Sequence, residues 1–338
     1  MESRRTLTRP LGLAAAAATA ALVLSSCSAG TGTDAGATAG EDAAIEDLKI
    51  IVPADPGGGW DQTGRALAND LEQNDLISSS QVVNVGGAGG TNGLASLATE
   101  QDPNTLMVMG YVMVGAVETN DSPNRIEDTT PIALLTEEPL VVVVPAESEY
   151  QDINDLVEDI EANGQDVSIT GGSAGGVDHI LAGMMLKNAG ISADNLNYIP
   201  YSGGGESLAA LLGNKVSAGI SGVGEYAEQV KAGELRALAV SGAEAAPQIP
   251  DTPTLTEQGV DIELTNWRGV VAPGSIDEAQ AEALTELVTD LQETEMWQET
   301  LETNAWADAF LAGDEFESFL TEDIENVNAI LTEIGLLD

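Results

Sequence analysis

Short apolar runs alternate with amphipathic stretches from about residue 48 onward. The runs at 48–52, 81–85 and 106–109 have the length of strands, and apolar positions at helical spacing predict helices at 65–71 and 92–99. Strands that alternate with helices are typical of βαβ units, which build parallel sheets. The first part of the chain is therefore predicted to be α/β.

A second alternating block begins with four consecutive valines at 141–144, which predict a strand that is buried on both faces. Further strands are expected at 167–169, 197–199, 216–220 and 235–240, and further helices at 156–161, 180–187, 208–212 and 226–231. The tail from Asp277 carries apolar residues at helical spacing and is predicted to be helical. The whole pattern favours two α/β domains with a cleft, in which ligands bind at the carboxyl ends of strands.

Composition narrows the possible functions. The chain has 338 residues, which suits about two domains of ~150 residues each, and it carries 11 basic against 56 acidic residues. Nucleic-acid binding is excluded because no basic stripe can be built. We interpret the acidity as favouring solubility and not as a sign of a cationic ligand. One Cys and one His exclude a disulfide framework and a His/Cys metal cluster, so we expect neither metal nor cofactor.

The N-terminus has the pattern of an export signal. Three arginines within the first nine residues precede an apolar run at 11–24, which is too short to span a membrane as a mature helix. The motif that follows, Leu24-Ser25-Ser26-Cys27, resembles a bacterial lipobox, in which cleavage precedes the Cys and the Cys carries lipid. The alternative is an incidental Cys in an ordinary signal, and the export route, general or twin-arginine, stays open.

These features predict a lipoprotein signal peptide at 1–27, a flexible tether at 28–45 and lipid attachment at Cys27. The tether is rich in Gly, Ala, Thr and Ser. The protein is therefore expected to be exported and anchored by lipid at the outer face of the cytoplasmic membrane.

Four glycine-rich loops are the main candidates for binding chemistry. They lie at 53–61, 86–91, 171–176 and 202–205, and the first three each follow a predicted strand and precede a predicted helix. Glycine lets backbone N–H groups approach a ligand, and a helix N-terminus adds free donors and a partial positive charge. Such loops can hold an anion without many basic side chains. For any single loop the alternative is a tight strand-to-helix turn.

Enzyme motifs in these loops are incomplete. Residues 59–66 have the spacing of a phosphate-binding P-loop, but Arg65 and Ala66 stand where Lys and Ser or Thr are needed. The segment 171–175 matches the Gly-x-Ser-x-Gly elbow of hydrolases, yet the only His of the chain, His179, lies too close in sequence to complete a triad. We therefore expect that the protein is not an enzyme.

Five segments, in this order along the chain, resemble the solute receptors of tripartite tricarboxylate transporters, the Bug family. They are residues 56–65, 86–91, 171–179, 200–206 and 231–240. The resemblance implies a two-domain periplasmic-binding-protein fold with the ligand in the interdomain cleft. Domain 1 would comprise 46–140 and 263–338, and domain 2 would comprise 141–262, with crossings near Leu140 and near Ile262.

The resemblance also implies a binding site in which the loops at 56–61 and 173–179 hold a ligand carboxylate through backbone amides. The ligand-binding residues expected on this basis are Pro56, Gly57, Gly58, Gly59, Trp60, Asp61, Gly89, Thr91, Tyr111, Ser173, Ala174, Gly175, Gly176, His179, Tyr201, Ser202 and Gly203. The implied partners are a small carboxylate and the large and small membrane subunits of the transporter. The receptor itself is expected to be a monomer.

The expected function is delivery of a carboxylate, with a tricarboxylate such as citrate favoured by the residues at 60–62 and 202–206. The alternative is a ligand sensor that presents its closed form to a membrane sensor kinase. Several residues have two interpretations. Asp61 caps a helix or orients the ligand, and His179 caps, packs or donates to the ligand. Arg65 forms a surface ion pair or adds positive field, and Trp60 and Tyr201 are walls of the cleft or plain packing.

Overall fold

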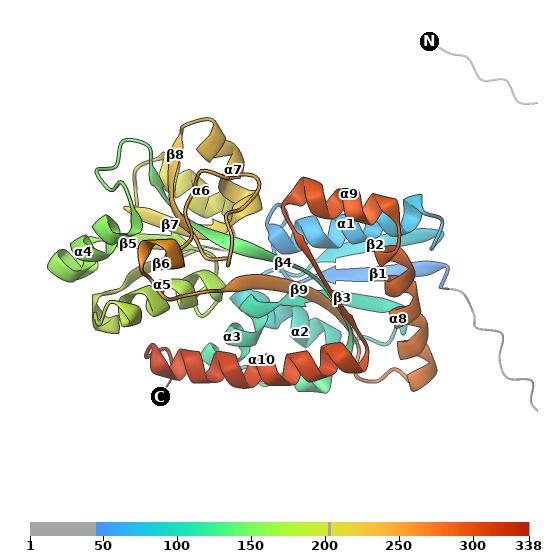
Figure 1. Ribbon diagram of the computed structural model, residues 1–338. Helices are drawn as coiled ribbons and strands as arrows, with labels where there is room; N and C mark the ends of the chain where they lie inside the picture. Colours follow the sequence, from blue (N-terminus) through green and yellow to red (C-terminus); the bar gives the residue numbers. More distant parts are fainter. Residues whose placement is uncertain (1–44, 202–203, 338) are drawn as a thin grey trace, which may run out of the picture. The chain divides into compact units, whose positions relative to one another are not determined.

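The computed structural model describes residues 45–201 and 204–337. The predicted signal peptide, Cys27 and nearly all of the tether lie outside the described residues. Within the described ranges the strands form one ten-stranded sheet in the order β2-β1-β3-β9-β4-β7-β5-β6, and β8 and β10 also pair with β4 (Figure 1).

The strands are β1 (Asp47–Val52), β2 (Ser79–Asn84), β3 (Thr105–Gly110), β4 (Thr130–Pro145), β5 (Ser168–Gly171), β6 (Asn197–Pro200), β7 (Ala218–Gly222), β8 (Leu235–Val240), β9 (Thr265–Ala272) and β10 (Ala307–Ala312). The α-helices are α1 (Gly59–Gln73), α2 (Thr91–Leu97), α3 (Tyr111–Thr119), α4 (Ile153–Asn163), α5 (Val177–Asn188), α6 (Gly204–Leu212), α7 (Val223–Lys231), α8 (Glu278–Gln292), α9 (Glu295–Asn304) and α10 (Asp314–Glu333). The predicted alternation of strands and helices is thus present.

The long strand β4 changes its neighbours partway along. Residues from Thr130 to Pro139 pair with β9, whereas pairing with β7 begins at Leu140. We call β1, β2, β3, β9 and β10 with α1–α3 and α8–α10 the first half, and β5–β8 with α4–α7 the second half. The change of partners falls at the residue where the sequence places the first crossing, and the domain limits themselves stay a prediction.

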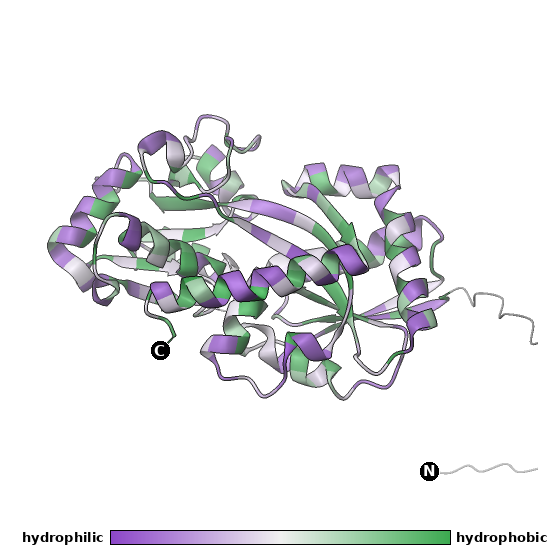
Figure 2. Cartoon of the chain, turned by 60° about the horizontal axis from the view of Figure 1, so that its bottom comes forward, coloured by the Kyte–Doolittle hydropathy of each residue, from purple (hydrophilic) through white to green (hydrophobic). Residues whose placement is uncertain are grey.

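Alternate residues of a strand face opposite sides of the sheet, and each side has its own helices. In β1, Ile50 belongs to an apolar cluster with residues of α1, α8 and α9, whereas Ile51 belongs to one with residues of α2, α3 and α10. The helix α10 is amphipathic, and Figure 2 shows hydrophobic and hydrophilic residues alternating along its length. Both faces of the sheet are therefore buried, as the sequence predicts for the strand at 141–144, whose four valines are fully buried.

Two expectations need correction. The sheet is mixed and not purely parallel, because β9 runs antiparallel between β3 and β4. The tail from Asp277 is not helical throughout, because β10 separates α9 from α10 and pairs antiparallel with β4. Apolar residues at helical spacing occur in both α8 and α10, so this spacing does not reveal β10, the half-buried strand that precedes α10. The helix α3 was not anticipated either, because its mostly apolar sequence lacks a polar face.

Candidate ligand-binding site

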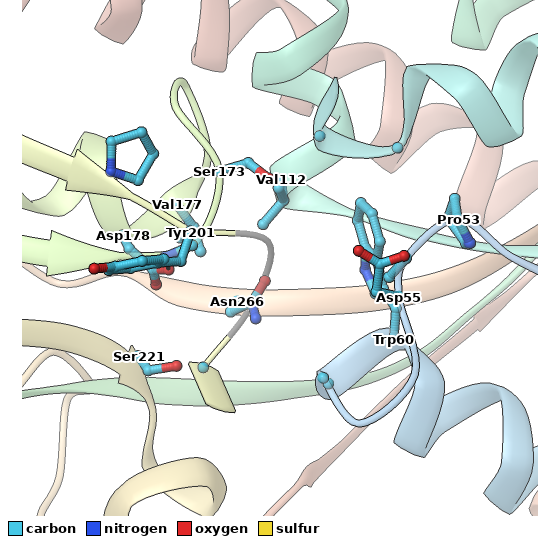
Figure 3. A pocket seen from close by; sticks show the side chains of 18 of the residues that line it. Pro53, Asp55, Trp60, Val112, Ser173, Val177, Asp178, Tyr201, Ser221 and Asn266 are labelled. Carbon is cyan, nitrogen blue, oxygen red and sulfur yellow. Dashed lines mark hydrogen bonds between the residues drawn. The ribbon is translucent and has the colours of Figure 1, made fainter. Parts of the chain in front are cut away.

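A cavity of about 420 Å³ lies where loops from both halves meet. It is lined by residues that follow or end β1, β2, β5, β6 and β7, together with Asn266 and Arg268 of β9 (Figure 3). Its volume is typical of small-molecule sites. The carboxyl ends of parallel strands are the usual position of such sites in α/β sheets.

Three helices begin at this pocket. Gly59, Val177 and Gly204 are the first residues of α1, α5 and α6, and all three line the cavity. The first N–H groups of a helix have no partner within it and carry a partial positive charge. The pocket can therefore offer backbone donors from both halves to one anionic group.

The first glycine loop is held in shape by Asp61. Its Oδ2 accepts the N–H of Gly57 and the Nε–H of Arg65, each at 2.9 Å, and its Oδ1 accepts the amide of Asn84 at 2.9 Å. Burial opposes its ionisation, but the hydrogen bonds from Arg65, Asn84 and Gly57 outweigh burial and lower the pKa of Asp61. Asp61 does not line the pocket, and it is not the N-cap of α1, which is Gly58. Its carboxylate holds the preceding loop from the first turn of the helix, and Arg65 forms the surface ion pair.

Arg268 lies directly beneath this loop. A Cβ built on Gly59 would overlap its guanidinium, so only glycine leaves room for that side chain. Arg268 is 3% exposed, forms an ion pair with the buried Glu138 and lies over the ring of Trp306, 5.4 Å from its centroid. Burial raises the pKa of Glu138, and the nearby Arg268 counteracts part of that rise. The basic group of the pocket is thus buried and already paired.

Trp60 is both a wall and a packing residue. It lines the pocket, and a Cβ on Gly90 would come within 2.8 Å of its ring. The indole nitrogen lies 3.3 Å from the position of a Cβ on Gly110. Two glycine-containing segments, those of Gly90 and Gly110, therefore close around the ring of Trp60.

The third glycine loop is fixed by the two residues that follow its helix start. The N–H of Gly172 donates to Asp178 Oδ2 at 2.6 Å, and the N–H of Gly175 donates to His179 Nδ1 at 3.1 Å. The His179 ring stacks on Tyr198, with centroids 4.2 Å apart. The structure therefore favours the packing interpretation of His179, which also holds the loop, because the N-cap of α5 is Gly176.

Burial controls the ionisation of both residues. It lowers the pKa of His179 to about 4, so the ring is neutral and its Nδ1 can accept a hydrogen bond. It raises the pKa of Asp178 to about 7, and the charges of Glu225 and Glu138 add to the rise while the Gly172 N–H and Arg268 oppose it. Asp178 is consequently a carboxyl group that titrates near neutrality at the edge of the pocket.

The described lining is more acidic than basic. Asp55, Asp178, Glu206 and Glu225 line the pocket, and among the described lining residues Arg268 is the only Lys or Arg. The Ser221 hydroxyl donates to Glu225 Oε2. Arg268 is already paired with a carboxylate, so the pocket has a surplus of acidic groups.

The structure brings only part of the predicted site to the cavity. Gly58, Gly59, Trp60, Gly89, Ser173, Ala174 and Tyr201 line it. Pro56, Gly57, Asp61, Thr91, Tyr111, Gly175, Gly176 and His179 do not line it. Ser202 and Gly203 lie outside the described residues. Within this second group, Thr91 supports its loop by donating to the Ala88 carbonyl at 3.0 Å.

Sequence reasoning missed several lining residues. Ser221 and Glu225 follow the predicted strand at 216–220, so their place at a strand end is a signal that could have identified them. Asn266 and Arg268 belong to a strand that was not predicted and carry no motif. Across residues 45–201 and 204–337, no group of three or more His, Cys, Asp or Glu is placed to hold a metal ion. In the same ranges, no helix is both long and apolar enough to cross a membrane.

Comparisons with known proteins show the family and the fold of the chain. Residues 64–336 match the family model described as tripartite tricarboxylate transporter family receptor. Protein BugT of Bordetella pertussis is 26% identical over 294 residues, which cover 85% of this chain and 89% of BugT. The solved structure of periplasmic binding protein BugD is 22% identical, with a TM-score of 0.77 over 86% of this chain and 98% of that one. MatC from Rhodopseudomonas palustris with bound malate is 20% identical, with a TM-score of 0.75 over 85% and 99% of the two chains. The predicted α/β periplasmic-binding-protein fold is confirmed.

Proposed function

The chain belongs to the receptor family of the tripartite tricarboxylate transporters, and we propose that it binds a small carboxylate outside the cytoplasm and delivers it to the membrane subunits of such a transporter. One observation carries the proposal. The first residues of α1, α5 and α6 come from both halves and line a single cavity above Arg268. Backbone donors and one buried cation are suited to a carboxylate.

The carboxylate is held between the two halves in this proposal. Gly58 and Gly59 approach it from the first half, and Ser173 and Ala174 approach it from the second half. A ligand that contacts both halves binds their closed arrangement better, and it shifts the population toward closure by no more than that difference in affinity. The transporter can then recognise the closed form as loaded. MatC binds malate, which supports a carboxylate ligand for this chain.

A tricarboxylate such as citrate is a less suitable ligand than a smaller acid. Four acidic residues line the described part of the pocket, and like charges brought close together in a partly desolvated site repel. Anchoring through lipid at Cys27 remains part of the proposal. The variant Cys27→Ser should be released from membranes or fail to mature, and unchanged membrane retention would contradict the anchor.

Thermal unfolding with a panel of mono-, di- and tricarboxylates tests the proposed function. A ligand that binds only the native state raises the melting temperature, and the shift grows with ligand concentration. The variant Gly58→Val tests whether the carboxylate binds in the pocket. A Cβ at Gly58 meets nothing within 4 Å and would project into open space beside the pocket. We expect it to weaken binding at least ~10-fold. A panel in which no carboxylate shifts the melting temperature would refute the proposal.

Solution scattering tests the closure. Saturating ligand should reduce the radius of gyration, because the two halves approach each other around it. Scattering curves that superpose with and without ligand would leave carboxylate binding intact but remove closure from the proposal.

A further inference from the structure

Glycines of the second half bring carboxylates close to the cavity. A Cβ on Gly172 would stand 2.8 Å from Asp178 Oδ2, and a Cβ on Gly204 would overlap the carboxylate of Glu225. All four residues line the pocket. We call Asp178 and Glu225 the acid wall. The chain uses positions without side chains to bring these two groups to the edge of the cavity.

The acid wall has no basic side chain of its own half beside it. Arg268 is the only Lys or Arg in the described lining, it comes from the first half, and it is ion-paired with Glu138. Glu138 lies against Gly222 of the second half, where a Cβ would overlap its carboxylate. The acid wall accepts hydrogen bonds from two neutral groups: the Ser221 hydroxyl donates to Glu225, and the Gly172 N–H donates to Asp178. Two neutral donors do not balance two carboxylates when water is expelled.

Asn266 provides an independent indication of a ligand donor. It is 8% exposed, lines the pocket, and within the described residues its Oδ1 has no hydrogen-bond partner. Its Nδ2 is 3.5 Å from Glu138 Oε1. A buried acceptor without a partner is costly, so it marks a place where a ligand N–H or O–H is expected.

The acid wall and the first glycine loop lie on opposite sides of the cavity. Figure 3 shows Trp60 and Asp55 on one side, Asp178 and Ser221 on the other, and Asn266 between them. Asp55 packs against Gly86, on the same side of the cavity as Trp60. A ligand that spans the cavity therefore meets the backbone donors of the first glycine loop at one end and the acid wall at the other.

We infer that the physiological ligand carries a cationic nitrogen as well as a carboxylate, at opposite ends of a short chain. The carboxylate binds the amides of the first glycine loop, and the nitrogen donates to Glu225, Asp178 and Asn266. This inference rests on the proposed function and specifies its ligand class. Placing an ammonium group against the acid wall supplies the missing charge and hydrogen atoms together.

Calorimetric titration with matched probes tests the inference. The probes are unbranched ω-amino acids of increasing chain length, the dicarboxylates of the same lengths and the corresponding monocarboxylates, each in buffer with and without EDTA. The tightest ω-amino acid should bind at least ~10-fold more tightly than the dicarboxylate of equal length. EDTA should leave that preference unchanged, whereas a preference that requires Ca²⁺ or Mg²⁺ would overturn the inference.

Two variants of α7 make the test specific to the acid wall. Glu225→Gln keeps the size and the acceptor for Ser221 but removes the charge, and it should abolish the preference for the amino acid. Glu228→Gln is the matched control, because Glu228 is an exposed residue of the same helix that pairs with Lys231 and does not line the pocket. It should keep the full preference.

The possible outcomes separate this inference from the proposed function. If carboxylates bind but the amino acid has no advantage, or if its advantage survives Glu225→Gln, the inference is wrong and the receptor function stands. If no probe of any kind binds, both are wrong. If Glu225→Gln unfolds in the absence of ligand, the wild-type ratio of amino acid to dicarboxylate affinity decides alone.

Discussion

Gly59 and Arg268 occupy one space: the guanidinium of Arg268 lies where a side chain at Gly59 would begin. Glycine in a helix normally costs about 0.5–1 kcal/mol relative to alanine. At this position the relation is reversed, because alanine must displace a buried, ion-paired arginine. The first glycine loop therefore packs against Arg268, a residue more than two hundred positions away in the sequence, and this packing requires glycine at position 59.

We predict that Gly59→Ala destabilises the protein by about 1–3 kcal/mol, the usual cost of overpacking. It should also weaken carboxylate binding, because Arg268 moves. Gly205→Ala is the matched control. Gly205 lies in α6 with nothing within 4 Å of a built Cβ, so this change should be neutral or stabilising. Urea unfolding measures both variants, and equal effects would show that Arg268 is not held against Gly59.

We predict that Arg268→Gln costs about 3–5 kcal/mol, because it leaves the carboxylate of Glu138 buried without its partner. Adding Glu138→Gln should recover most of this loss, since two neutral amides can replace a buried ion pair. The four proteins form a double-mutant cycle whose coupling energy reports the pair. Additive losses would mean that the two side chains do not depend on each other.

We predict that Gly175→Ala destabilises the third glycine loop more than its backbone angle alone explains. Gly175 has φ +76°, and a Cβ there would overlap Thr119 of α3. Gly233 has nearly the same φ, +72°, with nothing within 4 Å, so Gly233→Ala measures the backbone cost alone, roughly 1–2 kcal/mol. The excess at Gly175 reports the contact between the loop and α3. In the Gly175→Ala background, Thr119→Ser should not restore stability, because serine keeps the Oγ that a Cβ on Gly175 would overlap. Thr119→Gly removes that atom and should recover part of the loss.

We predict that Asp178 makes the protein less stable as pH rises from about 4 to 7. Its pKa is raised to about 7 in the native protein, so between the unfolded value of 3.8 and about 7 the native state binds the additional proton. The free energy of unfolding then falls by up to about 1.4 kcal/mol per pH unit and levels off above pH ~7.

Asp178→Asn removes this titration and keeps an acceptor for the Gly172 N–H. The difference in unfolding free energy between wild type and variant should therefore change with pH below neutrality and become constant above it. A difference that is the same at every pH would show that Asp178 is ionised throughout.

The sequence predicts the local part of this structure well, because local patterns decide it. The four valines at 141–144 are fully buried, and the glycine loops at 53–61 and 171–176 lie at strand ends beside one cavity. Both results follow from the period of apolar residues and from the flexibility of glycine.

The remaining part depends on pairing across long separations. β9 and β10 acquire their place through antiparallel pairing with β4, which no periodicity within either segment reveals. Arg268 is one of a few scattered basic residues until β9 places it under Gly59. Asp61 and His179 are close in sequence to the binding loops, yet they face inward and hold the loops in shape, because their oxygen and nitrogen atoms are used by the N–H groups of Gly57 and Gly175.

The helix α10 also decides when the chain can finish folding. One apolar cluster combines Ile51 and Met107 from the early strands with Phe316 and Leu331 from α10. During synthesis the N-terminal residues emerge first, so this cluster stays open until nearly the last residue has been added. The partly assembled sheet then exposes apolar surface that α10 alone can cover. A chain shortened before α10 would consequently be a substrate for chaperones and proteases, even though every loop that lines its pocket is present.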